Sequence, residues 1–158
     1  DIKGLEFNYD RVLKEGLALK VALALSSGDE TSTTGGSSPM IEIDPKELIV
    51  GLKWNSLDER WGLQGLLTLV DKSKNNLEPV CLNNSCDPRF VSAGYGLFDV
   101  FASYSPKDKI EFRLAFENIT DKKYHRWASV AQLPANDKEL DLYGQSGRSI
   151  SASFKYVF

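Results

Sequence analysis

The sequence has no apolar run long enough to form a transmembrane helix. Such a helix needs about 20 consecutive, mainly apolar residues, whereas polar or charged residues interrupt every apolar stretch of this 158-residue chain. A membrane-spanning β-strand is not excluded, because it needs only about ten tilted residues that are apolar on one face. The absence therefore excludes helical membrane proteins and leaves β-barrels open.

An excess of positive charge is also missing. The chain has 19 Lys and Arg residues against 22 Asp and Glu residues, and its net charge is -3. The sequence contains no basic patch and no arginine-rich segment. We therefore expect no nucleic-acid partner.

Histidine and cysteine are scarce. The one histidine, His125, has no serine or cysteine nucleophile motif near it, so no enzyme activity is expected. A zinc site at Cys81 and Cys86 would need two more ligands, so no resident metal is expected. The two cysteines lie close together in "EPVCLNNSCDPRF", which predicts a disulfide in an oxidising compartment. A pair of free surface thiols is the alternative.

Alternating hydrophobicity fills most of the chain. In a strand, successive side chains point to opposite faces, so alternation predicts a sheet with one apolar face. Seven segments alternate in this way, near residues 3–9, 16–25, 48–54, 61–69, 98–104, 110–117 and 150–158. The fold class predicted is therefore all-β and antiparallel.

The connections between these segments alternate between short and long. Tight turns are expected at "DRVLKE", "NSLDE" and "SPKDK", whereas the links near 26–47, 72–93 and 121–147 are long. In an up-and-down sheet all the long loops lie at one end, as in outer-membrane barrels. A soluble antiparallel sandwich also alternates and remains the alternative. The barrel reading predicts that residues 1–158 aggregate without detergent, and the sandwich predicts a soluble fragment.

Charge and aromatic placement favour the barrel. Charged residues fall opposite the apolar faces, as lipid contact requires: Lys20, Lys53, Glu111, Arg113 and Lys155. Aromatic residues at strand ends are expected to form interfacial girdles: Tyr9, Trp54, Trp61, Tyr104 and Phe158. Spanning sheets must be closed because unpaired edges are costly in lipid, so residues 1–158 are expected to form the C-terminal part of one larger transmembrane barrel domain.

Three stretches resemble the end of TonB-dependent outer-membrane receptors: "IKGLEFNYD", "YGLFDVFASYSPKDKIEFRLAFENITDKKYHRWASV" and "GRSISASFKYVF". "YHRWASV" and "YGQSGR" are most similar to the branch that takes haem, haemoglobin, transferrin or lactoferrin. Ser146 departs from this pattern, because the family more often has proline there. The resemblance implies a bacterial outer-membrane barrel of about twenty-two strands with a plug, of which this chain supplies about the last seven.

The function implied is active uptake of haem, or of haem from a haemoprotein, across the outer membrane. The TonB complex would act through an N-terminal part that this chain lacks, and haem would be a transported ligand rather than a permanent cofactor. Ferric-siderophore or transferrin-iron receptors are the near alternatives, and a passive porin is a more distant one. Further expected partners are lipopolysaccharide and the barrel-assembly machinery, for which Phe154, Tyr156 and Phe158 resemble the recognition signal.

Three adjacent residues are the candidate substrate contacts. Tyr124 and His125 are residue types that ligate haem iron. Arg126 could meet haem propionates or another anionic chelate. The alternative is that all three are ordinary residues of the barrel rim.

Overall fold

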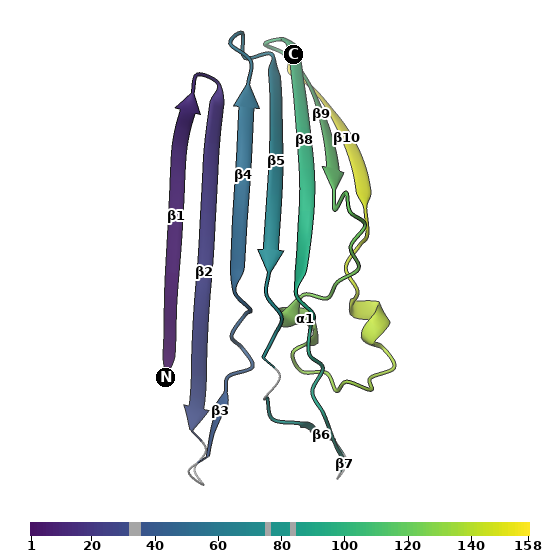
Figure 1. Cartoon of the computed structure of the whole chain (residues 1–158). Coiled ribbons are helices and arrows are strands. Elements are labelled where there is room, and N and C mark those ends of the chain that lie inside the picture. The colour runs from purple at the N-terminus through teal and green to yellow at the C-terminus, as the bar shows by residue number, and fades with distance from the viewer. Residues whose placement is uncertain (32–35, 75–76, 83–84) are drawn as a thin grey trace.

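One antiparallel sheet makes up most of the molecule (Figure 1). The computed structural model describes residues 1–31, 36–74, 77–82 and 85–158. The long strands pair in the order β1–β2–β4–β5–β8–β9–β10. Their bounds are β1 Ile2–Lys14, β2 Leu17–Thr31, β4 Glu47–Asn55, β5 Trp61–Val70, β8 Tyr95–Lys107, β9 Ile110–Glu117 and β10 Ser149–Tyr156. The seven predicted strands and their up-and-down order are confirmed.

The register places the apolar residues of neighbouring strands in common rows. Val21 pairs with Val50, which pairs with Leu67, which pairs with Phe98. We call the side that carries this row the outward face. Leu67 is 38% exposed and Phe98 41% exposed, as expected of a surface that faces lipid.

No second layer covers the outward face within the described parts of the chain. The buried apolar side chains among them are Trp127, Val130 and Ala131. All three belong to the loop that connects β9 to β10, and none lies in a core between two sheets. A sandwich would bury the inner faces of two sheets in a common core. The soluble sandwich alternative is therefore not supported.

The opposite, luminal face is polar and recessed. Lys53, Gln64, Ser103, Arg113 and Ser153 line a hollow of about 640 Å³ on it. Arg113 donates two hydrogen bonds to the carboxylate of its strand neighbour Glu111, at 2.8 and 3.0 Å. The predicted inward placement of the charged residues is confirmed.

Tight connections lie at one end of the sheet, the turn end, which is uppermost in Figure 1. The first turn is shorter than predicted: residues 10–14 of "DRVLKE" continue β1, and the chain reverses at Glu15 and Gly16. Pairing of Arg11 with Leu19 and of Val12 with Ala18 extends the strand beyond its apolar pattern. Gly16 supplies the positive φ of 74° that the reversal needs.

The second turn, between β4 and β5, closes on its own side chains. The Ser56 hydroxyl donates to the Asp58 carboxylate and accepts a hydrogen bond from the Trp61 backbone N–H at 2.9 Å. The hydrogen bond from Ser56, followed by one from the backbone N–H of Arg60, lowers the pKa of the Asp58 carboxyl. These contacts let the chain reverse within five residues, 56–60.

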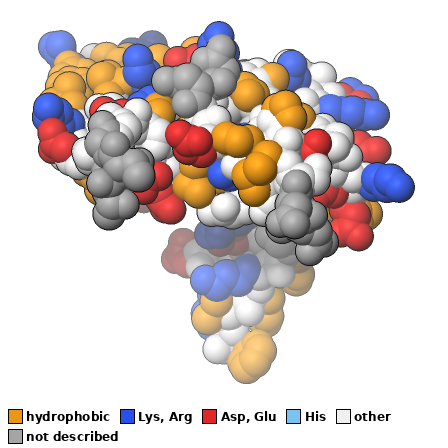
Figure 2. Space-filling view, turned by 90° about the horizontal axis from the view of Figure 1, so that it is seen from below, with side chains coloured by type: hydrophobic (Ala, Val, Ile, Leu, Met, Phe, Trp, Pro, Cys, Tyr) orange, Lys and Arg blue, Asp and Glu red, His pale blue; other side chains and the backbone are white. Residues whose placement is uncertain are grey.

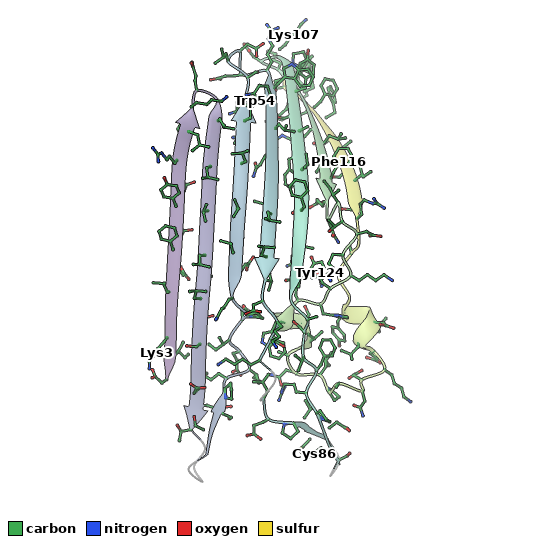
Figure 3. All side chains as sticks on the ribbon, viewed as in Figure 1. Lys3, Trp54, Cys86, Lys107, Phe116 and Tyr124 are labelled. Atoms are coloured by element: carbon green, nitrogen blue, oxygen red, sulfur yellow. A yellow bond between two sulfur atoms is a disulfide. The ribbon has the colours of Figure 1, made fainter. Side chains whose placement is uncertain are left out.

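Aromatic side chains mark the turn end of the outward face. Trp61 stacks on Tyr104 with ring centroids 4.1 Å apart, and Trp54 lies close to the same end (Figure 3). This is the arrangement expected of an interfacial girdle.

Strand β1 carries cations at both ends of its outward face. Lys3 lies at the loop end, 3.2 Å from the carboxylate of Asp1. Arg11 lies toward the turn end and donates to the Tyr9 hydroxyl at 3.4 Å. Leu5, Phe7 and Tyr9 occupy the outward positions between the two cations.

Short elements decorate the other end of the sheet, the loop end. They are β3 (Ser37–Pro39), β6 (Val80–Leu82), β7 (Ser85–Asp87), α1 (Trp127–Val130) and the 3₁₀ turn η1 (Leu140–Tyr143). β3 pairs with the polar end of β2, which runs past its apolar part to Thr31. Part of the predicted loop 26–47 is therefore strand. None of the helices in the described segments has the length and apolar character needed to cross a membrane.

Candidate functional site

The loops at the loop end pack on a small apolar cluster. Trp127 and Val130 of α1, together with Ala131, are buried. They contact partly buried side chains from all three long connections: Ile41, Leu77, Phe90, Leu133 and Leu140. Figure 2, which looks onto this end, shows apolar side chains bordered by acidic and basic ones.

Directional bonds add to the apolar packing. The Trp127 indole N–H donates to the carbonyl of Ile41 at 2.8 Å, so it ties the first long loop to the last. The Arg89 guanidinium donates hydrogen bonds to the backbone carbonyls of Glu78 (3.0 Å) and Ala131. The backbone N–H of Phe90 donates to the Leu133 carbonyl at 2.9 Å. The three loops are thus joined through the segment that contains α1.

Asn118 holds the base of the last loop. Its side chain accepts a hydrogen bond from the Lys122 N–H at 2.9 Å, and donates to the carbonyls of Lys122 (2.9 Å) and Ser146 (3.4 Å). Asp121 accepts a hydrogen bond from the Arg148 N–H at 2.8 Å. The two ends of the loop therefore meet where β9 ends and β10 begins.

A hollow of about 450 Å³ opens beside this base on the luminal side. Tyr95 and Tyr124 form one wall, with ring centroids 4.2 Å apart. Arg126 also lines the hollow. Three carboxylates contribute to it from the first loop, from β4 and from β8: Asp44, Glu47 and Asp99.

The structure separates the three predicted contacts. Tyr124 and Arg126 line the hollow, and Figure 3 shows Tyr124 where the strands give way to the loops. His125 instead packs edge-on against Phe90, with centroids 5.4 Å apart, and its Nε2 lies 3.1 Å from the Leu140 carbonyl. His125 is therefore held among the loops, because successive residues of this extended segment point to opposite sides.

Sequence reasoning missed Tyr95, Asp44 and Glu47. The alternating pattern could have identified Tyr95, because this residue lies on the same, inward face of β8 as Leu97 and Asp99. Nothing in the sequence signals that Asp44, in a loop far along the chain, lies on the same hollow.

The hollow combines chemistries suited to a planar or chelated anionic ligand. Phenol oxygens are ligands for ferric iron, aromatic faces can stack on a flat ligand, and a guanidinium can bind a carboxylate in a bidentate manner. Within the described residues, no three His, Cys, Asp or Glu side chains are close enough together to hold a metal ion.

The predicted disulfide is present. Cys81 and Cys86 are joined across the two-stranded β6–β7 hairpin, with their Cα atoms 4.0 Å apart. Figure 3 shows Cys86 at the tip of the loop end, opposite Lys107 at the end of β8. The disulfide is remote from the luminal hollow and has a structural role in the hairpin.

The candidate assembly residues lie at the turn end. Phe154 and Tyr156 are on the outward face of β10, 62% and 54% exposed, and Phe158 lies beyond the strand. Their recognition by assembly machinery stays a prediction.

Comparison with known proteins adds relatives of modest identity, and no family model matches. Haemoglobin-haptoglobin utilization protein B of Neisseria meningitidis serogroup C is 28% identical over 143 residues, which cover 84% of this chain. Transferrin-binding protein A of Haemophilus influenzae is 26% identical over 73% of the chain. The chain spans only 17% and 14% of these two relatives.

Solved structures share the fold over 99% of the chain. The copper transporter OprC superposes with a TM-score of 0.77 at 21% identity, and a ferric enterobactin receptor (PfeA) mutant from Pseudomonas aeruginosa with 0.74 at 18%. The FrpB iron transporter from N. meningitidis gives 0.68 at 21%. The chain covers 22 to 24% of these three structures.

These comparisons confirm the family resemblance and the barrel fold predicted from the sequence. The predicted outer-membrane location agrees with them. The names are those of transporters, receptors and binding proteins, in keeping with the expectation of no enzyme activity.

Proposed function

We propose, from the premise that this chain is part of the β-barrel of a TonB-dependent outer-membrane receptor, that the receptor actively imports haem. The haem would arrive free or from a haemoprotein. Transport would be driven by the TonB complex through a part of the receptor outside residues 1–158, as the family resemblance implies.

The observation that carries this proposal is the luminal hollow at the loop end. Tyr95 and Tyr124 offer two phenol groups and an aromatic wall, and Arg126 offers a partner for a propionate. These groups lie on the luminal side, where the loops join the strands. Three of the relatives, with names that refer to haemoglobin or haemoglobin–haptoglobin, support haem as the ligand.

A ferric siderophore or transferrin iron is the alternative ligand source. One relative is a transferrin-binding protein, and one structural neighbour is a ferric enterobactin receptor. Arg126 and the phenols would also suit an anionic ferric chelate. The test must therefore separate the ligands and must also separate active uptake from passive flow through a porin.

The test is a haemin titration of the full-length receptor in outer membranes, followed by Soret absorbance. We expect saturable binding that Tyr124→Phe and Arg126→Ala each weaken about tenfold, or about 1.4 kcal/mol. Tyr104→Phe is the matched control, because it removes a phenol hydroxyl from the outward face. His125→Ala tests the remaining candidate ligand and is expected to change the Soret spectrum less than Tyr124→Phe does.

Growth on haemin as the sole iron source, with and without a functional TonB complex, tests the transport step. Uptake that persists without TonB would favour a porin. Absence of saturable haemin binding, with a ferric siderophore or transferrin bound instead, would overturn the haem assignment.

A further inference from the structure

We propose that the η1 turn is a docking point for a protein ligand whose contact surface is basic around an apolar socket. This inference rests on the proposed function, because it assigns a protein donor of the transported iron source to a particular surface. It concerns a part of the loop end separate from the luminal hollow. Figure 1 shows the turn as the yellow-green coil at the margin of the loops, outside the sheet.

The turn exposes large apolar side chains. Leu142 is 78% exposed and Tyr143 is 37% exposed. Leu140, one turn earlier, packs inward against the cluster around Trp127. The segment thus has one anchored apolar residue and two presented ones.

Several contacts hold the turn in place. The Leu140 carbonyl lies 3.1 Å from His125 Nε2, and Gly144 forms a β-bridge with His125. Asp137 accepts a hydrogen bond from the Glu139 N–H at 2.7 Å. A preorganised contact surface loses less conformational entropy on binding than a mobile one. His125 is therefore a positioning residue for this surface.

Acidic residues surround the presented side chains. Residues 137–143 read "DKELDLY", with three carboxylates and one lysine. Glu139 and Asp141 are exposed, and neither forms an ion pair among the described residues. Two apolar side chains within a negative border complement an apolar socket with a basic rim.

A protein is the occupant that this surface fits. A small ligand needs a concave pocket that surrounds it, whereas Leu142 projects outward from a turn. Lipid phosphates would be repelled by Glu139 and Asp141. Two relatives are named for binding transferrin or for binding haemoglobin and haemoglobin–haptoglobin.

The test measures haemoglobin binding to cells that display the full-length receptor. Leu142→Ser is expected to weaken binding at least about tenfold, the loss typical of an interface hot spot. Leu57→Ser is the matched control, because Leu57 is 76% exposed but lies in a tight turn at the opposite end. The double change Glu139→Gln and Asp141→Asn is expected to reduce the salt dependence of binding while it keeps the Asp137 contact.

Free haemin uptake by the same cells separates this inference from the proposed function. Unchanged haemin uptake with weakened haemoglobin binding supports the docking surface. Equal haemoglobin binding by Leu142→Ser and wild type overturns it, as does a parallel loss of haemin uptake or of surface display. If wild-type cells take up no haemin yet Leu142→Ser weakens haemoglobin binding, the haem proposal fails and the docking surface stands.

Discussion

Asn118 shows how one residue can fix the base of a long loop. It ends β9 with a positive φ of 49°, a backbone conformation that asparagine tolerates better than most residues. It is 5% exposed, and its side chain contacts backbone groups on both sides of the loop. Asparagine is suited to this position because one short side chain supplies both a donor and an acceptor.

Replacement of Asn118 by alanine is expected to destabilise the last loop by about 1–3 kcal/mol, because it removes two part-buried hydrogen bonds to the Lys122 backbone, each contributing about 0.5–1.5 kcal/mol. The measurement is protease cleavage within residues 119–148 of the folded receptor as a function of denaturant. Asn118→Gly is the control, since glycine adopts the same φ at no steric cost. Stability restored by glycine would assign the effect to the backbone and contradict the hydrogen-bond explanation.

Residue types at the candidate site could be predicted from the sequence, but their grouping could not. Tyr124 and Arg126 share the hollow because they are two residues apart in an extended segment, which alternation can anticipate. The turning of His125 toward Leu140 depends on where η1 packs. Asp44 lines the hollow in a loop that the Trp127 indole holds at the Ile41 carbonyl, a contact across 86 residues that has no local sequence signal.

Strand β1 and strand β2 meet at a turn that also touches β4. The Asn55 N–H donates to the Gly16 carbonyl at 2.7 Å, and a Cβ atom on Gly16 would clash with the Asn55 carbonyl oxygen. Gly16 is therefore required both for its positive φ and for the close approach of a neighbouring strand.

Gly16→Ala is expected to cost at least about 1–2 kcal/mol, the strain of a left-handed residue with a side chain. Heat-induced unfolding of the receptor in detergent, followed by gel mobility, would show a lower midpoint. Gly4→Ala serves as the control, because its Cβ would lie 3.6 Å from the Leu25 carbonyl oxygen, an ordinary contact. Equal midpoints for the two variants would contradict this account.

The long strands were predictable, whereas the short elements of the loop end were not. Each long strand carries a period-two pattern over most of its length, imposed by two different solvents on its faces. β3, β6 and β7 have three residues each, too few to show a period, and α1 has four. β3 is held by its pairing with the end of β2, as between Asp29 and Pro39, whereas β6 and β7 pair with each other and are joined by the Cys81–Cys86 disulfide.

At the scale of the whole molecule, the outward and luminal faces of the sheet differ in their tolerance for charge. Leu67→Arg places a cation on the outward face and is expected to reduce folding into lipid vesicles by about 2–4 kcal/mol. Gln64→Arg places the same side chain on the luminal face of the same strand and is expected to have little effect. Folding of the full-length receptor, measured against denaturant concentration in vesicles, gives both values. Equal effects would contradict the assignment of the two faces.

The distance between the two cations of β1 also indicates which bilayer thickness the sheet matches best. From Lys3 to Arg11 the strand rises by about 26 Å at about 3.3 Å per residue, and a tilt of about 40° reduces the height to about 20 Å. This height is less than the thickness of an average hydrocarbon core, which is about 30 Å. Hydrophobic mismatch would therefore be smaller in a thin bilayer, such as the bacterial outer membrane, than in one of average thickness.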